Sequence, residues 1–256
     1  MKITDKKYFS EYYDQIGDKI AEIIDKFDFS DQRVDLGYAT QASAVYSSNI
    51  EGNTVDLNSF MNYKFSREKF KPTKEIVEIE NLVAAYHFAQ GKPLNEVNFL
   101  DCHRLLSETL VIKSKRGKYR VEKVGVYGET GLIYLAIEPA FVPERMKTFF
   151  QNIAALLQMQ LTIEEVFYFA ALIHLIFVHI HPFRDGNGRA ARLLEKWFLS
   201  EKAGDKFWKI PSEKYYRDHQ QKYYANINLG VNYYELNYDH CLPFLMMLPN
   251  ALLSNK

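Results

Sequence analysis

Apolar residues recur at intervals of three and four along most of the chain, a spacing typical of helices that bury one face. The helices predicted in this way cover residues 8–27, 38–50, 57–61, 75–87, 97–110, 143–157, 164–180, 188–203 and 212–229. Gly52 suits a left-handed cap at the end of the second helix, and Asp56 suits an N-cap before the third. We interpret the basic stretch from Lys64 to Lys74 as a solvated connection. The pattern predicts a mostly helical chain.

One stretch, between Gly117 and Val142, departs from helical spacing. Its apolar residues flank Gly128 and Gly131, which is typical of a β-hairpin. Because an isolated hairpin is only marginally stable, we expect this one, over about residues 122–136, to lean on the helices. The predicted fold is therefore all-α, a helical bundle with a small β-hairpin.

Composition narrows the class of protein. Of the 256 residues, 47% are hydrophobic and 25% are charged, as in soluble globular proteins. The 32 basic and 32 acidic residues cancel, so the chain lacks the basic field that nucleic-acid-binding proteins need, and no nucleic acid partner is expected. The most apolar segment, residues 166–183, is short and contains three histidines. We therefore expect it to be a buried core helix and expect no membrane partner.

Cysteine and histidine usage indicates neither a disulfide scaffold nor a metal centre. Cys102 and Cys241 lack the spacing of metal ligands, which favours reduced thiols and a cytoplasmic location. The first residues contain no apolar stretch typical of a secretory signal. We interpret His174, His179 and His240 as packing residues, because no cysteine or carboxylate lies at ligand spacing from them.

Candidate chemistry concentrates between His181 and Arg192, where the most apolar helix ends and another begins. Gly186, Asn187 and Gly188 form a loop whose backbone N–H groups can converge at a helix N-terminus. Such a loop is a site for an anion, and phosphate is its natural occupant. By itself a Gly-Asn-Gly sequence is only a turn, so this interpretation depends on the residues around it.

The side chains that adjoin this loop complete a site for phosphate transfer. Arg189 and Arg192 are three residues apart on the next helix, so both guanidinium groups project from one side and suit a polyphosphate. Asp185 offers a hard oxygen ligand for Mg²⁺, and His181 offers a general base for a hydroxyl group. Each feature alone has an ordinary structural explanation, but their combination in one short stretch indicates phosphate-transfer chemistry.

The sequence from His181 to Arg192 matches the pattern HPFx(D/E)GNGRxxR at every specified position and thereby resembles the Fic-domain protein adenylyltransferases. The likeness covers residues 73–248 and includes Gly117 to Arg120, Ile210 with Pro211, and a hairpin in the position of the family's flap. It implies the Fic fold, with this flap over the active site, and transfer of AMP from ATP to a Tyr, Thr or Ser hydroxyl of a target protein. Related kinases, which bind the nucleotide reversed, carry lysine in place of Gly188.

The resemblance also implies roles for individual residues. His181 would deprotonate the target hydroxyl, and Asp185 would hold Mg²⁺ between the α- and β-phosphates of ATP. Nucleotide binding would fall to Gly186, Asn187, Gly188, Arg189 and Arg192. Asn187 and the glycine amides would bind the α-phosphate, and the two arginines would hold the β- and γ-phosphates. Pro182 and Phe183 would fix the loop by packing.

A second motif precedes this core. Ser47 to Gly52 matches the family's inhibitory pattern, (S/T)xxxE(G/N), and so resembles the class with an N-terminal inhibitory helix. The resemblance implies that Ser47 and Glu51 belong to this helix, over about residues 38–52. It also implies that Glu51 forms a bidentate ion pair with Arg192, which would leave ATP in a non-productive pose.

The resemblance divides the chain into an N-terminal helical segment, residues 1–72, that carries the inhibitory helix, and a Fic core, residues 73–256, with the flap and C-terminal helices. A flap with an exposed edge can hold a target segment as an added strand. Target docking would then involve Val124, Gly125, Val126, Tyr127, Leu132, Ile133 and Tyr134. The alternative is a hairpin that only covers the helices.

Other functions stay open at this point. In some relatives the glutamate that corresponds to Glu51 aligns water for AMP removal, so a de-AMPylating hydrolase or a bifunctional enzyme is one alternative. A transferase that uses another nucleotide is a second. A nucleotide-binding regulatory protein silenced by Glu51 is the non-enzymatic alternative, although such a protein would not require His181. The expected partners are ATP and a target protein, and homo-oligomers are left open.

Overall fold

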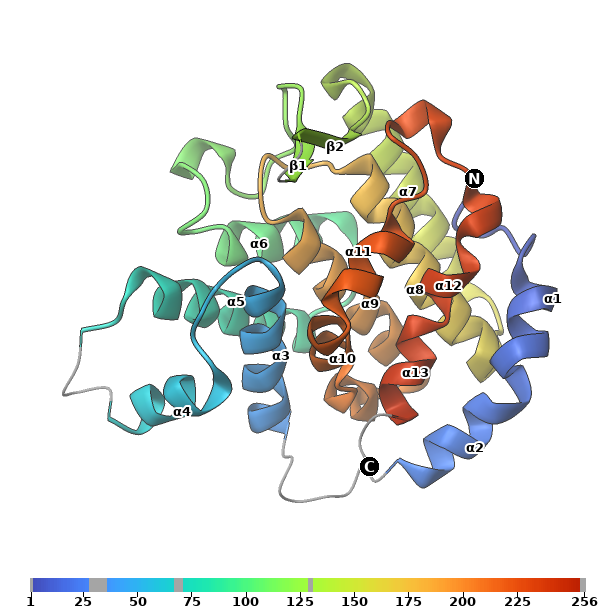
Figure 1. The fold of residues 1–256 in the computed structure, drawn as a ribbon, viewed down its shortest axis with the longest axis horizontal. Coiled ribbons are helices and arrows are strands. Elements are labelled where there is room, and N and C mark those ends of the chain that lie inside the picture. The colour runs from blue at the N-terminus through green and yellow to red at the C-terminus, as the bar shows by residue number, and fades with distance from the viewer. Residues whose placement is uncertain (1, 28–35, 67–70, 129–130, 254–256) are drawn as a thin grey trace.

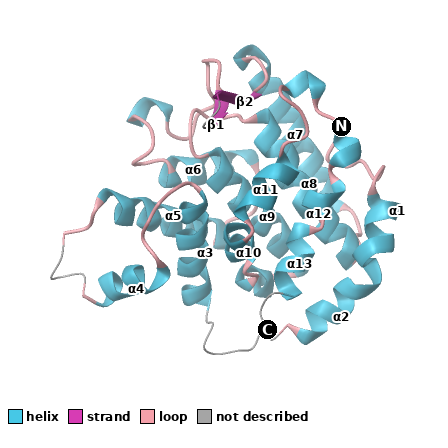
Figure 2. Cartoon of the chain, viewed as in Figure 1, coloured by secondary structure: helices cyan, strands magenta, loops and turns pink. Residues whose placement is uncertain are grey.

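The computed structural model describes residues 2–27, 36–66, 71–128 and 131–253, which fold into helices and one small hairpin (Figure 1). The helices are α1 (Phe9–Tyr12), α2 (Asp18–Lys26), α3 (Leu36–Ile50), α4 (Leu57–Phe65), α5 (Lys74–Gln90), α6 (Glu96–Leu106), α7 (Val142–Gln158), α8 (Ile163–Ile180), α9 (Asn187–Ala203), α10 (Ser212–Asp218), α11 (Gln220–Ile227), α12 (Leu242–Leu245) and α13 (Met247–Leu253), and the strands are β1 (Gly125–Gly128) and β2 (Gly131–Leu135). Figure 2 shows how small the strand content is. The predicted helical fold with a hairpin is confirmed.

Helix α8 forms the centre of the core, and its sequence explains why. Every residue from Val166 to Ile180 is buried, and α2, α7, α9, α12 and α13 pack against the helix. A capping box closes its N-terminus, because Thr162 and Glu165 each bond the other's backbone N–H. By length and composition α8 is apolar enough to cross a membrane, but 83% of it is buried inside the protein. The predicted core helix is therefore confirmed.

Strands β1 and β2 form an antiparallel hairpin at one end of the bundle (Figure 1). The paired residues are Gly125 with Leu135, Val126 with Tyr134, Tyr127 with Leu132, and Gly128 with Gly131. The side chain of Tyr134 points into the protein, where its hydroxyl donates to the carbonyl of His179 over 2.5 Å. The N–H of Leu135 donates to the carbonyl of Val231 over 2.9 Å. The hairpin thus leans on the end of α8 and on the segment that follows α11.

Helix α3 lies beside α5, α9 and α10 (Figure 1), so the N-terminal segment shares one hydrophobic core with the rest of the chain. The helix ends at Ile50, and Glu51 therefore lies in the turn after it, not within the helix as the range 38–52 implied. Gly52 adopts φ +92°, the left-handed cap conformation that its sequence position predicted. Helix α3 thus delivers Glu51 from its C-terminal end.

Two predicted helices have different boundaries in the structure. The helix expected over residues 212–229 is interrupted at His219, which separates α10 from α11, and the helix expected over residues 97–110 ends at Leu106. The first predicted helix contains a π-helical turn over Tyr13–Gly17. Apolar spacing alone does not show such breaks, because they shift the helix face without changing which residues are apolar.

Apolar spacing over residues 75–87 does not by itself determine which face of α5 is buried. Ala84 and His87 are exposed, and the buried residues are Ile79, Leu82, Val83, Ala85, Tyr86 and Ala89. Two overlapping stripes of apolar residues occur in this sequence, and packing against α3 and α6 decides which of them is buried. Residues 67–70 of the predicted connection and residues 129–130 of the predicted hairpin lie outside the described residues.

Candidate active site

His181 follows the last residue of α8 and adopts a left-handed backbone conformation, φ 52° and ψ 57°. Its Nδ1 atom lies 3.2 Å from the carbonyl oxygen of Val178, which can only accept, so Nδ1 donates and Nε2 keeps its lone pair. Burial, together with the nearby cation of Arg120, lowers the pKa of His181 to about 4. The imidazole is therefore neutral at pH 7, as a general base requires.

The carbonyl groups around the end of α8 are paired one by one, which fixes the backbone of His181. A helix end leaves such carbonyls without helical partners, and buried ones need other donors. The donors are the imidazole of His181 for Val178, the hydroxyl of Tyr134 for His179, the guanidinium of Arg120 for Ile180 and His181, and the backbone N–H of Arg120 for Pro182. Five consecutive carbonyl groups are thereby satisfied.

The side chain of Asn187 closes the loop that follows His181. Its Oδ1 accepts from the N–H of Phe183 and its Nδ2 donates to the carbonyl of Phe183, each over 2.9 Å. This buried amide therefore shapes the loop, and its contact with the α-phosphate stays a prediction. The backbone N–H groups of the first turn of α9 have no partner within the helix and can bind an anion there.

His103 supports the same loop from α6. Its Nε2 lies 3.0 Å from the carbonyl oxygen of Asp185, and its Nδ1 accepts from the N–H of Gly117 over 3.0 Å. The ring stacks on Phe183 with centroids 3.5 Å apart and planes 9° apart. Burial lowers the pKa of His103 to about 4, so the neutral ring donates through one nitrogen and accepts through the other.

Asp185 lies exposed at the rim of the loop. Its Oδ1 accepts from the N–H of Gly186 over 2.6 Å, and no other described residue bonds its carboxylate. Mg²⁺ commonly binds through one or two carboxylates together with phosphate oxygens and water, so Asp185 fits Mg²⁺ that arrives with a nucleotide. In the described part of the chain no group of three or more His, Cys, Asp or Glu residues could hold a metal ion.

Arg192 is fully buried, and each of its nitrogens has a partner. Its Nε donates to Oγ of Ser47 over 2.8 Å, and its Nη2 donates to the Ser47 carbonyl over 3.0 Å and to Oε1 of Glu51 over 2.6 Å. Its Nη1 donates to the hydroxyl of Tyr223 over 3.1 Å. The predicted contact between Glu51 and Arg192 is present. It is not bidentate, because Ser47 takes the donors on the same side of the guanidinium.

Glu51 lies where the loop and α9 would receive an anion. Burial raises its pKa, but the charges of Arg192 and Arg189 outweigh that effect and hold the pKa below its ordinary value. A Cβ atom added to Gly188 would lie 2.2 Å from Oε1 of Glu51, so the carboxylate rests directly against this glycine. A negative charge thus already occupies the N-terminal turn of α9.

Arg189 is held more weakly than Arg192. Its Nη2 lies 3.9 Å from Oε2 of Glu78, at the outer limit of an ion pair. Its Nε is buried and has no hydrogen-bond partner among the described residues. Because a buried donor without a partner is costly, this guanidinium suits an incoming anion, in line with the expected role in phosphate binding.

A buried network behind Arg192 was not predicted. The hydroxyl of Tyr223 accepts from Arg192 and donates to Nε2 of His174 over 3.0 Å. Nδ1 of His174 donates to Glu195 over 2.9 Å, and the same carboxylate accepts from Tyr216. His174 is packed in the core against Tyr216, Tyr223 and Phe244, as interpreted from the sequence, and it also forms hydrogen bonds that the sequence did not predict.

A polar seam joins α3 to α9 along their antiparallel faces. From one end to the other, the facing pairs are Ser43 with Lys196, Ser47 with Arg192, and Glu51 with Gly188. The members of each row are four residues apart, which places them on one face of each helix. Lys196 also forms a buried ion pair with Glu213. The seam holds Glu51 in register with the loop.

The predicted docking residues of the flap fall into three groups. Tyr127, Leu132 and Ile133 are exposed, and Val124, Gly125 and Val126 are half-buried. The third is Tyr134, which is buried and bonded to His179, so its side chain cannot meet a target as predicted. The other residues of β2 are exposed, and the hydrogen bond to the carbonyl of His179 holds the side chain of Tyr134 inside the protein.

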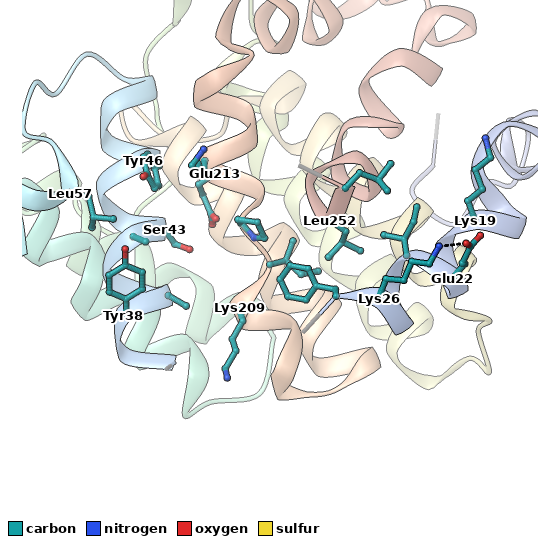
Figure 3. Close-up of a pocket in the computed structure, with 18 residues that line it drawn as sticks. Lys19, Glu22, Lys26, Tyr38, Ser43, Tyr46, Leu57, Lys209, Glu213 and Leu252 are labelled. Atoms are coloured by element: carbon teal, nitrogen blue, oxygen red, sulfur yellow. Dashed lines mark hydrogen bonds and ion pairs between the residues drawn. The ribbon is translucent and has the colours of Figure 1, made fainter. Parts of the chain in front are cut away.

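A cavity of about 510 Å³ lies away from this site, between α2, α3, α10 and α13 (Figure 3). Tyr38, Ser43 and Glu213 line it, together with Lys26 and Leu252. None of the predicted site residues lines the cavity. The geometry of the loop, and not this cavity, therefore identifies the candidate active site.

Residues 93–199 match the sequence profile of the Fic/DOC family. This stretch, less than half of the chain, is similar to the Fic/DOC family. Among solved structures the chain is similar to a Fic family protein from Desulfovibrio desulfuricans G20, with 25% identity, a TM-score of 0.76, and coverage of 94% of this chain and 71% of that one. It is also similar to a Fic domain containing signaling protein from Bacteroides thetaiotaomicron VPI-5482, with 20% identity, a TM-score of 0.63, and coverage of 94% and 92%. For Fic-1 from C. elegans the identity is 19%, the TM-score 0.69, and the coverage 96% and 71%.

The matched residues begin shortly after α5, run through most of α9 and contain the whole loop from His181 to Arg192. Proteins of this family are generally transferases, known for moving nucleoside monophosphates to proteins. The N-terminal segment with α3 lies outside the matched residues, but it supplies Ser47 and Glu51 to the site.

Sequence reasoning missed three residues that shape this site, namely His103, Arg120 and Tyr223. Arg120 belongs to the Gly117–Arg120 stretch that the resemblance includes, but only its position in the fold shows its role. His103 and Tyr223 lie on amphipathic helices, where a polar residue among apolar ones was the one available signal. Asp185, which His103 bonds, is 82 residues away in sequence, and Arg192, which bonds Tyr223, is 31 residues away, both beyond the reach of a local pattern.

Proposed function

We propose that this protein transfers AMP from ATP to a hydroxyl side chain of a target protein and that Glu51 inhibits the transfer. One observation carries the proposal: the carboxylate of Glu51 rests against Gly188 and bonds Arg192 at the N-terminal turn of α9. That turn and its arginines form an anion site. A carboxylate in this place is a built-in competitor for a nucleotide phosphate.

The chemistry follows from the protonation state of His181. Nε2 of the neutral ring takes the proton of the target hydroxyl, and the hydroxyl oxygen attacks the α-phosphorus of ATP. A P–O bond to the target forms, the bond between the α- and β-phosphates breaks, and pyrophosphate leaves with the electron pair. The products are the AMP-modified target, pyrophosphate and a proton. Catalysis rests on orientation and charge stabilisation, without a covalent intermediate on the enzyme.

The protein's own groups would hold the nucleotide at three points. The N–H groups of the first turn of α9 face the α-phosphate, and Arg189 and Arg192 hold the β- and γ-phosphates. Asp185 would hold Mg²⁺, which neutralises phosphate charge when bound. The exposed apolar residues Tyr127 and Leu132 of the flap would meet the target chain as it adds to the edge of the hairpin.

Inhibition follows from the seam between α3 and α9. While α3 is docked, Arg192 uses four of its five N–H groups to bond Ser47, Glu51 and Tyr223, and the carboxylate of Glu51 takes the place of a phosphate. Loss of the Glu51 carboxylate frees Nη2 and removes the negative charge from the anion site. The unmodified chain should therefore show little transfer, and the variant without this carboxylate should show much more.

The test compares three purified proteins: wild type, Glu51→Gly, and Glu51→Gly combined with His181→Ala. Each is incubated with α-labelled ATP, Mg²⁺ and a cell lysate, and labelled proteins are detected after electrophoresis. We expect Glu51→Gly to label target proteins at least about tenfold more than wild type, which corresponds to ~1.4 kcal/mol, and the double variant to label none. Equal labelling by wild type and Glu51→Gly would contradict autoinhibition, and labelling by the double variant would contradict the role of His181.

Removal of AMP is a second candidate activity, supported by one detail of the site. Only Oε1 of Glu51 bonds Arg192, and no described residue bonds Oε2, which is therefore open to a water molecule near His181. A water oriented there could attack a phosphorus already bound to a target. Incubation of wild type with a labelled target distinguishes the two activities, since release of AMP would favour removal. A panel of labelled nucleotides in the same assay tests whether the donor is ATP.

A further inference from the structure

Arg120 makes an unusual set of contacts for a cation that is 2% exposed. Its side-chain nitrogens donate to carbonyl oxygens of the backbone, and no salt bridge to a carboxylate is present among the described residues. The acceptors are the carbonyls of His181 at 2.7 Å, Glu122 at 3.0 Å, Ile137 at 2.5 Å and Ile180 at 3.5 Å. The backbone N–H of Arg120 donates to Pro182 over 2.9 Å.

These acceptors belong to three separate pieces of chain. Glu122 lies just before β1 and Ile137 lies just after β2, so the guanidinium binds both ends of the hairpin. Ile180 and His181 form the end of α8, where the helix dipole is negative and a cation is favoured. The guanidinium of Arg120 therefore joins both ends of the hairpin to the backbone of His181, whose side chain is the general base.

We propose that Arg120 is a positioning residue that holds the flap and the imidazole of His181 at a fixed separation, so that a hydroxyl presented by the flap meets Nε2. The inference rests on the proposed function, since it assumes that the flap docks the target. Arg120 does not touch the substrate in this scheme. It acts through its hydrogen bonds to two backbone segments, the ends of the hairpin and the end of α8.

The geometry explains why arginine stands at this position. A guanidinium offers five N–H donors in a rigid plane, whereas a lysine ammonium offers three donors from a single atom. Lysine can therefore keep the charge beside α8 but cannot reach the carbonyls of Glu122, Ile137 and His181 at once. The hydroxyl of Tyr134, which donates to His179, is a second and weaker tie between flap and helix.

Arg120→Lys in the Glu51→Gly background tests the proposal. We expect kcat/KM for a target protein to fall by about 100-fold, the loss typical of a misplacement of about 1 Å. Affinity for ATP, measured by calorimetry, should change by less than about twofold, because α9 and its N-terminal turn are untouched. The matched control is Arg184→Lys, which alters an exposed ion pair between the loop and Glu122 and should leave both values unchanged.

Hydrogen exchange supplies a readout that needs no activity. In Arg120→Lys the amides of residues 125–127 and 134–136 should exchange faster, while those of α9 keep their protection. If Glu51→Gly transfers nothing to any protein, the proposed function fails, and this comparison still decides whether Arg120 ties the flap to α8. Unchanged exchange in the flap would overturn the proposal, as would an unchanged kcat/KM.

A purely structural role predicts a different result, in which Arg120→Lys loses thermal stability, ATP affinity and transfer together. If that variant does not fold, Tyr134→Phe takes its place, because it removes the second tie without burying a charge. We then expect kcat/KM for the target to fall by about fivefold at unchanged ATP affinity, which is the size expected for one hydrogen bond. Equal losses of both values in Tyr134→Phe would also overturn the proposal.

Discussion

The carboxylate of Glu51 and the α-carbon of Gly188 are in such close contact that a Cβ atom on residue 188 would lie 2.2 Å from Oε1 of Glu51. This added Cβ atom would also lie 3.1 Å from Nη1 of Arg192. Position 188 therefore has room either for the inhibitory carboxylate or for a side chain. This relationship connects the two sequence motifs, although 137 positions separate them in the chain.

Gly188→Ala should loosen the docking of α3 without any change to α3 itself. The new methyl group displaces the Glu51 carboxylate, and Arg192 loses a charged hydrogen bond worth about 1.5–3 kcal/mol. We expect faster hydrogen exchange across residues 36–50. In the Glu51→Gly background the same substitution should add nothing, because no carboxylate is left to displace. Additive effects of the two substitutions would show that the contact does not hold α3.

Ser47 and Ser48 form a matched pair of test sites. Oγ of Ser47 accepts from Nε of Arg192, whereas Oγ of Ser48 is buried without a partner among the described residues. Ser47→Ala leaves a buried charged donor unpaired, at a cost of about 1–3 kcal/mol, so we expect weaker docking of α3 and higher transfer in the labelling assay. Ser48→Ala should leave transfer unchanged. Equal activation by the two variants would contradict the role given to Ser47.

The buried ion pair between Lys196 and Glu213 should matter for stability. Both side chains are fully buried, and Lys196 also donates to Ser43 over 2.7 Å. Burial raises the pKa of Glu213, but Lys196 outweighs it and holds the pKa below its ordinary value. Lys196→Met leaves the carboxylate buried without its cation, so we expect the free energy of unfolding in urea to fall by about 3–5 kcal/mol.

The control for this prediction neutralises the partner as well. Glu213→Gln keeps a group that can bond the hydroxyl of Tyr86 but carries no charge. Combined with Lys196→Met it should restore a large part of the stability, because the cost comes from the unpaired charge. If the double variant is no more stable than Lys196→Met alone, the loss in the free energy of unfolding comes from lost packing and not from the unpaired charge.

Three histidines whose pKa values are lowered in the folded protein should make the fold sensitive to acid. Burial lowers the pKa of His103, His179 and His181 to about 4 each, from an ordinary value of 6.5. The unfolded chain therefore binds protons below pH 6.5 that the folded chain does not bind until about pH 4. Stability should be fully present above pH 6.5 and should fall toward pH 4 by about 1.4 kcal/mol per pH unit for each histidine.

Urea unfolding between pH 5 and pH 7 measures this slope. His179→Gln can still bond Tyr238 and the carbonyl of Ile227 but cannot titrate. We expect its slope to be smaller by about one proton. A slope equal to that of the parent would mean that His179 is not the group that resists protonation.

Local rules account for what the sequence determined. The helical fold, the hairpin, the core helix α8 and the anion loop could all be predicted, because each depends on residues within a few turns of one another. Apolar spacing, the glycines and the motif from His181 to Arg192 carry this information within short segments. The resemblance of Ser47 to Gly52 further predicted which arginine meets Glu51.

Tertiary structure decided how these segments meet. Helix α3 is rich in Ala and Ser, so its sequence marks no strong apolar stripe, and packing against α5 and α10 sets its register with α9. In that register one oxygen of Glu51 accepts a hydrogen bond from Arg192. Other N–H groups of the guanidinium donate to Ser47 and Tyr223.

The same reason explains the roles of Arg120 and of the buried flap residue Tyr134. Every residue has a backbone carbonyl that can accept a hydrogen bond, whatever its side chain. The sequence therefore does not show which carbonyls Arg120 binds. Only the folded chain brings the end of α8 and both ends of the hairpin around this one cation. The sequence determined the reactive groups of this protein, and long-range packing decided what holds them in place.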